Sequence, residues 1–144
     1  MARLNRIQHE YVDFIPARLE GGRLYISMKY RTATHLCCCG CGMEVVTPLN
    51  PAKWHLSDHG ATVSLHPSIG NWSFPCRSHY WITSGKVLWA SAMSEGQIRR
   101  VRAGDHRAVE VEAQRESRVD QPREETTQSA SWVTRFIEWL RRLL

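Results

Sequence analysis

Alternation of apolar and polar residues is the main pattern in residues 11–90, and it predicts short, half-buried β-strands. The clearest case is 24–28, where Leu24, Ile26 and Met28 would share one face. Residues 80–83 and 86–90 flank the dipeptide Ser84-Gly85, which predicts a hairpin with a two-residue turn. Residues 68–73 have no period and are predicted to form a loop. Further β-rich runs, each ended by proline, glycine or polar turn residues, occupy 11–15, 32–37, 44–47, 54–56 and 62–65.

The C-terminal third has a different pattern. Ser94, followed three residues later by Gln97, predicts the start of a short helix that ends near Arg102. Residues 103–131 have no aromatic residue and many charges of both signs, which predicts a disordered linker. Ser131 can cap a helix over 132–144, whose apolar residues fall on one stripe. We expect this helix to dock on its own domain, on a partner or on a membrane surface.

Fold class and organisation follow from these patterns. We predict a mainly β protein, with short antiparallel strands, a short helix and a tethered amphipathic helix. The predicted segments are a β-rich domain at 1–102, a charged linker at 103–131 and the C-terminal helix at 132–144.

The charge pattern narrows the possible partners. The formal net charge is +5, but no dense basic run is present, so nucleic-acid binding is not expected. No apolar run approaches the length of a membrane span, and no signal-peptide pattern follows Met1. We therefore expect a cytoplasmic protein, in which thiols stay reduced and favour metal binding over disulfides.

The five cysteines lie in two places and predict a zinc site. Four of them occur in the glycine-containing run at 37–42, and Cys76 follows as part of a C-x-x-H pair with His79. Structural zinc sites typically take two ligands from each of two chain segments. The first segment offers a C-x-x-C pair, Cys38 and Cys41, and a C-G-C pair, Cys39 and Cys41, and both interpretations stay open.

Three residues are candidates for hydrolytic chemistry near this metal. Glu44 is a conceivable general base for a zinc-bound water. Ser78 precedes His79, but neighbours in a strand point to opposite faces, so their adjacency is poor evidence for a catalytic pair. Ser68 lies in the aperiodic segment just before the second metal-binding motif. Trp54 is either a core residue or a binding platform.

Several motifs carry a resemblance to a known family. They are Tyr25-Ile26-Ser27-Met28, His35-Leu36-Cys37, Cys39-Gly40-Cys41-Gly42, Val45-Val46-Thr47-Pro48-Leu49, Ser64-Leu65, Pro67-Ser68-Ile69-Gly70-Asn71-Trp72 and Pro75-Cys76-Arg77-Ser78-His79-Tyr80-Trp81-Ile82. Over residues 10–95 the chain resembles a small bacterial family encoded in operons with ubiquitin-like proteins and their activating and conjugating enzymes.

The resemblance implies a zinc-binding β domain that serves as a peptidase in phage defence. It implies Cys39, Cys41, Cys76 and His79 as the metal ligands, with Cys37 as a possible replacement, whereas Cys38 departs from the family pattern. The favoured function is a zinc-dependent peptidase for a ubiquitin-like protein, in which Glu44, Ser68 or Ser78 assists the metal. The alternatives are a non-enzymatic zinc-ribbon-like adaptor for a conjugation enzyme, and a nucleic-acid binder that uses Trp54.

Overall fold

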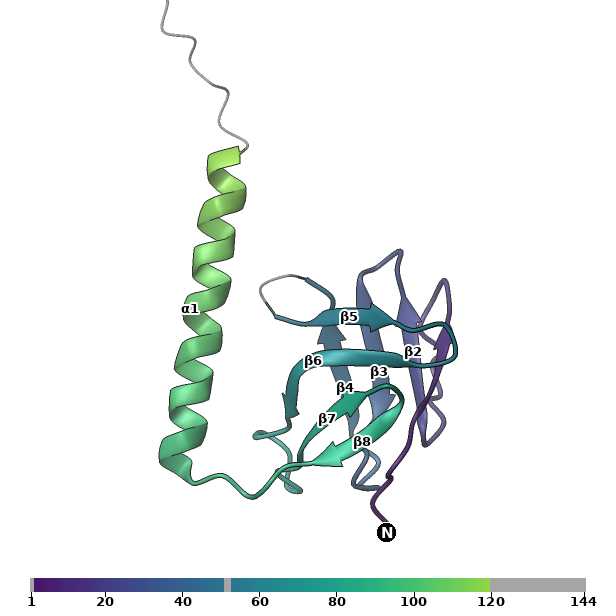
Figure 1. Ribbon diagram of the computed structural model, residues 1–144. Coiled ribbons are helices and arrows are strands. Elements are labelled where there is room, and N and C mark those ends of the chain that lie inside the picture. Colours follow the sequence, from purple (N-terminus) through teal and green to yellow (C-terminus); the bar gives the residue numbers. More distant parts are fainter. Residues whose placement is uncertain (1, 51–52, 120–144) are drawn as a thin grey trace, which may run out of the picture. The chain divides into compact units, whose positions relative to one another are not determined.

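The computed structural model describes residues 2–50 and 53–119 of the chain. The chain divides into two compact units, 1–112 and 113–144, and the sheets belong to the first. The described residues form eight strands and one helix (Figure 1). The elements are β1 (Gln8–Tyr11), β2 (Arg23–Ser27), β3 (Thr32–Leu36), β4 (Glu44–Pro48), β5 (His55–Asp58), β6 (Val63–Gly70), β7 (His79–Thr83), β8 (Lys86–Trp89) and α1 (Glu95–Val119).

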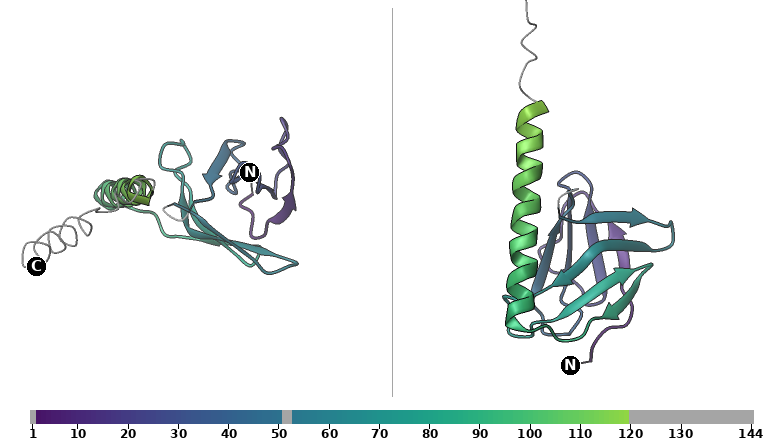
Figure 2. Two further views of the ribbon diagram at one scale, coloured as in Figure 1. Left: turned by 90° about the horizontal axis from the view of Figure 1, so that it is seen from above. Right: turned by 60° about the vertical axis from the view of Figure 1, so that its left-hand side comes forward.

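The strands form two four-stranded sheets, with the orders β1-β2-β3-β4 and β5-β6-β7-β8. All neighbouring strands are antiparallel except β1 and β2, which pair in parallel. Figure 2 shows the two sheets as facing layers. The mainly β fold predicted from the sequence is confirmed.

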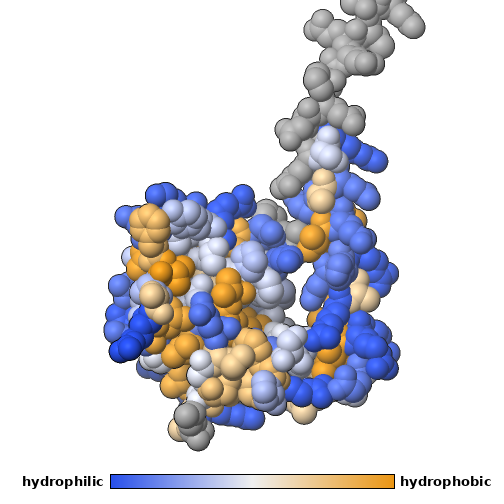
Figure 3. All heavy atoms as spheres, turned by 180° about the vertical axis from the view of Figure 1, so that it is seen from behind, coloured by the Kyte–Doolittle hydropathy of each residue, from blue (hydrophilic) through white to orange (hydrophobic). Residues whose placement is uncertain are grey.

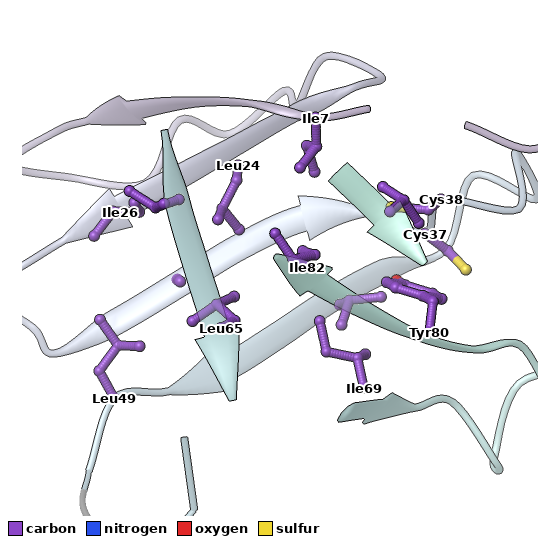
Figure 4. Packing of buried hydrophobic residues seen from close by; sticks show 14 residues of the cluster. Ile7, Leu24, Ile26, Cys37, Cys38, Leu49, Leu65, Ile69, Tyr80 and Ile82 are labelled. Carbon is purple, nitrogen blue, oxygen red and sulfur yellow. The ribbon is translucent and has the colours of Figure 1, made fainter. Parts of the chain in front are cut away.

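One hydrophobic core fills the space between the two layers (Figure 4). Leu24 and Ile26 of β2 contribute from one sheet, and Leu65 and Ile82 contribute from the other, each with no exposed surface. Leu24 and Ile26 share the buried face as predicted. Met28 does not, because β2 ends at Ser27 and Met28 is 60% exposed in the following turn.

Two strands differ from their predicted positions. β1 covers 8–11 instead of 11–15, and Phe14 is 65% exposed. β6 continues to Gly70, through residues predicted to be a loop. The period is interrupted there by a bulge between Leu65 and Ile69, after which Ile69 is again buried and pairs with Tyr80. Leu65 and Ile69 are four residues apart but pair with Ile82 and Tyr80, which are two apart, so two extra residues bulge out of β6 and Pro67 is exposed where the alternation expects a buried residue.

Local turn and cap chemistry agree with the sequence. Ser84 and Gly85 have φ angles of 47° and 69°, as a two-residue hairpin turn of type I′ requires. At the start of α1, the Gln97 backbone N–H donates to Ser94 Oγ at 3.3 Å, and the Ser94 N–H donates to Gln97 Oε1 at 2.8 Å. This reciprocal pair is the predicted capping box.

Helix α1 is longer than the sequence predicted. It continues past Arg102 to Val119, so residues 103–119 of the predicted linker are helical. Composition showed that this segment buries little apolar surface, but its Arg, Ala, Glu and Gln residues are strong helix formers. The remainder of the predicted linker and the predicted helix at 132–144 lie outside the described residues. No helix in the described ranges is long and apolar enough to cross a membrane.

Candidate metal centre and candidate active site

Four thiols converge where the end of β3 meets the loop between β6 and β7. The Sγ atoms of Cys37, Cys39, Cys41 and Cys76 all lie within 4.8 Å of one another. The separations are 3.4 Å for Cys37–Cys39, 3.9 Å for Cys37–Cys76 and 3.7 Å for Cys41–Cys76. Four sulfurs around a tetrahedral zinc at 2.3 Å would be about 3.8 Å apart. The four thiols therefore have the spacing and the chemistry to hold a metal ion of the zinc type.

Backbone turns bring these thiols together. After β3, the Cys37 N–H donates to the Met43 carbonyl at 2.8 Å, and the Gly40 N–H donates to the Cys37 carbonyl at 3.0 Å. Gly40 and Gly42 have φ angles of 84° and 78°, a conformation in which a side chain would be strained. The glycines between the cysteines thus allow the tight turn that gathers three sulfurs from one short segment.

The cluster includes three of the four predicted metal ligands, Cys39, Cys41 and Cys76. Its fourth member is Cys37, which the resemblance gave as a possible replacement, and His79 lies elsewhere. Cys38 points into the hydrophobic core with no exposed surface, and burial raises the pKa of its thiol to about 12. The Cys38–Cys41 pairing therefore does not contribute two ligands, because neighbouring residues of the segment point in different directions.

Cys76 is the thiol best prepared for a metal. Burial by itself raises the pKa of Cys76, but hydrogen bonds from the side chain and backbone of Ser78 and from neighbouring thiols lower that pKa to about 7. A thiol binds metal as the thiolate. The lowered pKa shows that the surroundings of Cys76 favour the anion near neutral pH.

A buried polar network supports the cluster from the core side. Ser78 Oγ accepts a hydrogen bond from Asn71 Nδ2 at 2.9 Å and lies 3.0 Å from Cys37 Sγ. Because the Asn71 amide is the donor to Ser78, the hydroxyl hydrogen is free to point at the sulfur. Hydrogen bonds of this kind orient metal ligands. Ser78 is 7% exposed and is fully engaged in this network.

The network continues to a histidine in the core. His35 Nε2 lies 2.9 Å from the hydroxyl of Tyr80, and Asn71 Nδ2 lies 3.4 Å from the same hydroxyl. Complete burial lowers the pKa of His35 to about 4, so its ring is neutral at neutral pH. His35 thus contacts Tyr80 between the two sheets, and its Nδ1 is buried without a hydrogen-bond partner among the described residues.

Ser68 of β6 and His79 of β7 lie on the outer face of their sheet, away from the hydrophobic core. Gly70 of β6 pairs with His79 of β7, and the adjacent Ile69 and Tyr80 point into the core. Because side chains alternate along a strand, His79 is directed to the outer face. Ser68 precedes Ile69 in the bulged part of β6, which has no regular partner in β7, and it lines the same pocket as Gly70 and Trp72.

Two tryptophans enclose His79 on this outer face. Its ring centroid lies 4.9 Å from that of Trp72 and 5.2 Å from that of Trp81. This burial lowers the pKa of His79, and His79 Nδ1 is buried without a hydrogen-bond partner among the described residues. His79 is thus a neutral imidazole at neutral pH whose Nδ1 is buried and unpaired in the described residues, and its side chain lines a pocket with Trp72, Cys76 and Ser78.

Ser68 lines a pocket of about 240 Å³ on this face. Its walls include Trp54, Pro67, Gly70 and Trp72. Ser68 is half-buried and lies in the bulged part of β6, where a strand departs from regular pairing. Bulges commonly occur beside active sites because they redirect a side chain.

The other candidate residues have different surroundings. Glu44 is an exposed residue at the start of β4, paired with Leu36. Ser64 Oγ lies 2.9 Å from His59 Nε2, a serine–histidine contact that the sequence analysis missed because the two residues face each other only across a hairpin. Ser64 is only 2% exposed, and its hydroxyl accepts a hydrogen bond from the backbone N–H of Ser84 in the turn between β7 and β8.

The outer face depends on the absence of a side chain at Gly70. A Cβ at this position would lie 2.4 Å from two atoms of the Trp72 ring. We expect Gly70→Ala to displace Trp72 and to lower the free energy of unfolding by about 1–3 kcal/mol. Gly21→Ala is the matched control, because no atom lies within 4 Å of its added Cβ. Chemical denaturation measures both, and an equal effect of the two changes would contradict the close packing of Trp72 on Gly70.

Comparison with known proteins gives one match. A family model described as "Bacterial ubiquitination-like system serine protease (BubE)" matches residues 11–90. This range contains all four cysteines of the cluster, Ser68, Ser78 and His79. No curated protein and no solved structure matches the chain.

Proposed function

Because the chain belongs to the family of bacterial ubiquitination-like system serine proteases (BubE), we propose that it cleaves a ubiquitin-like protein with Ser68 as nucleophile and His79 as general base. The observation that carries this assignment is their shared position on the outer face of β6 and β7. Ser68 lines one pocket there and His79 lines another, with Trp72 in the walls of both, and His79 Nδ1 has no hydrogen-bond partner among the described residues. The proposed substrate is a precursor of the ubiquitin-like protein, or a conjugate that contains it.

Two other serines fit the role of nucleophile less well. Ser78 is nearly buried, and its hydroxyl lies between Asn71 and Cys37 in the network behind the cysteines. Ser64 contacts His59 but is even less exposed. A nucleophile must approach the scissile carbonyl carbon, so an accessible serine in a pocket is favoured over both.

The proposed reaction follows the general course of serine peptidases. Ser68 Oγ attacks the scissile carbonyl carbon while its proton passes to His79. His79 then gives this proton to the leaving amine as the carbon–nitrogen bond breaks, which leaves an ester on Ser68. Water, deprotonated by His79, hydrolyses the ester and restores the serine.

The described structure has no hydrogen bond between Ser68 and His79, so the imidazole must turn toward Ser68 when the substrate binds. Catalytic hydrogen bonds are often long or misaligned before the substrate is present. The tryptophans on either side of His79 limit the directions in which its ring can turn.

We further propose that zinc at the four cysteines is structural. Catalytic zinc sites keep one position open for water, whereas four thiolates close the tetrahedron. When bound, the metal would crosslink the turn after β3 to the loop that enters β7. The four cysteines would in this way fix the start of β7, and with it His79, beside β6. Glu44 has no assigned role in this mechanism.

The test is a cleavage assay on a ubiquitin-like protein of the same system that carries a C-terminal extension. The proposal expects one new N-terminus at a single bond, found by mass spectrometry, and covalent labelling of Ser68 by a fluorophosphonate. A folded, metal-loaded protein that neither cleaves nor is labelled would contradict the peptidase assignment and favour the adaptor alternative.

The pH dependence of this cleavage follows from His79. Burial lowers the pKa of His79, so the neutral base persists below the ordinary histidine value of about 6.5. We expect kcat/KM to be constant near neutral pH and to fall as the pH drops through a midpoint below about 6.5. Initial rates in buffers of constant ionic strength measure this profile. A midpoint clearly above that value would contradict His79 as the base.

A further inference from the structure

A second groove lies beside the Ser68 pocket, and no function has yet been assigned to it. It has a volume of about 530 Å³, within the usual range of ligand sites. The end of β1, the turn after β2, the segment after β4 and strand β5 form its walls. The residues that line the groove include Tyr11, Met28, Leu49, Asn50, Trp54 and Leu56.

The groove surface is mainly apolar, and part of it is open to solvent. Met28 is 60% exposed and Tyr11 is 45% exposed, while Leu49 forms a buried floor. Phe14 and Tyr30 extend the apolar surface beyond Met28, with ring centroids 5.5 Å apart and exposures of 65% and 52%. In Figure 3, orange residues gather on the β domain, whereas blue residues dominate the visible side of α1. A contiguous exposed apolar patch often marks an interaction site.

Two buried polar atoms in the groove have no partner among the described residues. They are Trp54 Nε1, whose hydrogen can only be donated, and Asn50 Oδ1, which can only accept. Leaving such atoms unpaired is costly, and both belong to residues that line the groove, so a ligand bound there can supply their partners when the side chains turn toward it. A peptide group presents one carbonyl oxygen and one N–H, which are the complementary acceptor and donor.

Trp54 connects this groove to the proposed nucleophile. Its side chain lines both the groove and the pocket that contains Ser68. The Tyr11 hydroxyl donates to Asp58 Oδ2 at 2.6 Å, and this bond joins the two sheets at the side of the groove. The groove and the Ser68 pocket are therefore neighbours that share Trp54 as a wall.

We infer that the groove binds an extended peptide segment of the ubiquitin-like substrate, close to the scissile bond. An apolar substrate side chain would contact Met28, Leu49 and Leu56, and a backbone peptide group would pair with Trp54 Nε1 and Asn50 Oδ1. This inference rests on the proposed peptidase function and adds the surface that recognises the substrate.

The test separates binding from cleavage. The probe is the ubiquitin-like protein with its C-terminal extension, titrated against full-length Ser68→Ala protein by isothermal calorimetry. In that background we compare Met28→Asp, which places a charge on the groove, and Trp54→Phe, which keeps a ring but removes the N–H. The matched control is Val46→Asp, an equally apolar and 53% exposed position on β4 outside the groove.

We expect Met28→Asp and Trp54→Phe to weaken binding by about 10-fold or more, consistent with the loss of a buried apolar contact or one hydrogen bond. Val46→Asp should change the Kd less than twofold. In the active protein, Met28→Asp should raise KM while kcat stays within about threefold. Metal content and thermal unfolding confirm that every variant is folded.

The outcomes separate this inference from the function on which it rests. If the wild-type protein cleaves the probe and both groove variants keep its Kd and KM, the groove inference is wrong and the peptidase assignment stands. If the probe binds through the groove but is never cleaved, the groove inference stands and the peptidase assignment is wrong. If Val46→Asp weakens binding as much as Met28→Asp, recognition does not depend on the groove, and the inference is overturned.

Discussion

Ser68→Ala is expected to reduce kcat/KM for cleavage of the extended ubiquitin-like protein by at least about 10³-fold, because loss of the nucleophile removes the covalent route. The protein should keep its fold, since Ser68 is half-buried and forms no hydrogen bond that holds the two sheets together in the described structure. Product formation, followed by gel and by mass spectrometry, measures the rate. Circular dichroism and thermal unfolding verify the fold.

Two further serine variants give this experiment its controls. Ser73→Ala changes an exposed serine near the same site in sequence and should leave the rate unchanged within about twofold. Ser78→Ala removes the hydroxyl beside Cys37 and should weaken metal binding by about 10–100-fold. If Ser78→Ala is inactive when fully loaded with metal while Ser68→Ala is active, the nucleophile is Ser78 and the present assignment is wrong.

Removal of the metal is expected to have the largest effect on stability. Cys76 is the only ligand from the loop that enters β7, so Cys76→Ser would break the crosslink between the two chain segments. We expect the purified variant to lack zinc and to lose more than about 4 kcal/mol of unfolding free energy, as for other structural metal sites. Elemental analysis and urea denaturation measure the two quantities. Chelation of the wild-type protein should give a similar loss.

Two variants test whether the cluster is specific for the four assigned thiols. Cys38→Ala removes a fifth cysteine that points into the core, and it should keep one zinc per chain with a stability loss of only about 1 kcal/mol. His79→Ala should also keep the zinc, because His79 lies on the outer face of β7. Loss of zinc from His79→Ala with retention in a Cys37→Ala variant would restore the ligand set that the sequence analysis favoured.

The cysteine cluster shows how far local sequence patterns predict the candidate metal site. Closely spaced cysteines separated by glycine predicted a metal site. The spacing of Cys76 and His79 predicted that these two residues supply the other two ligands. Spacing alone could not exclude His79, because the direction of a side chain depends on which strand face it occupies. In the structure the pairing of Gly70 with His79 places the imidazole on the outer face, while Cys76 lies with the other thiols of the cluster.

Helix α1 and strand β6 show the same limit in two other ways. Composition predicted a disordered linker from residue 103, which is wrong for 103–119 because a segment that buries little apolar surface can still form a helix. β6 was hidden because a bulge breaks the period of two just before Ser68. Its backbone pairs with β7, a contact between segments that no local pattern contains.

By itself, the sequence determined the mainly β class, the hairpin at Ser84-Gly85, the capping box at Ser94 and the thiol-rich segments that form a candidate metal site. Each of these depends on neighbouring residues, whose turn, cap and ligand chemistry acts over a few positions. Only the tertiary structure decided that Cys37 completes the cluster, that Ser78 is buried behind it, and that Ser68 and His79 share a face. Those facts depend on strand register, which is set by the packing of two sheets around one core.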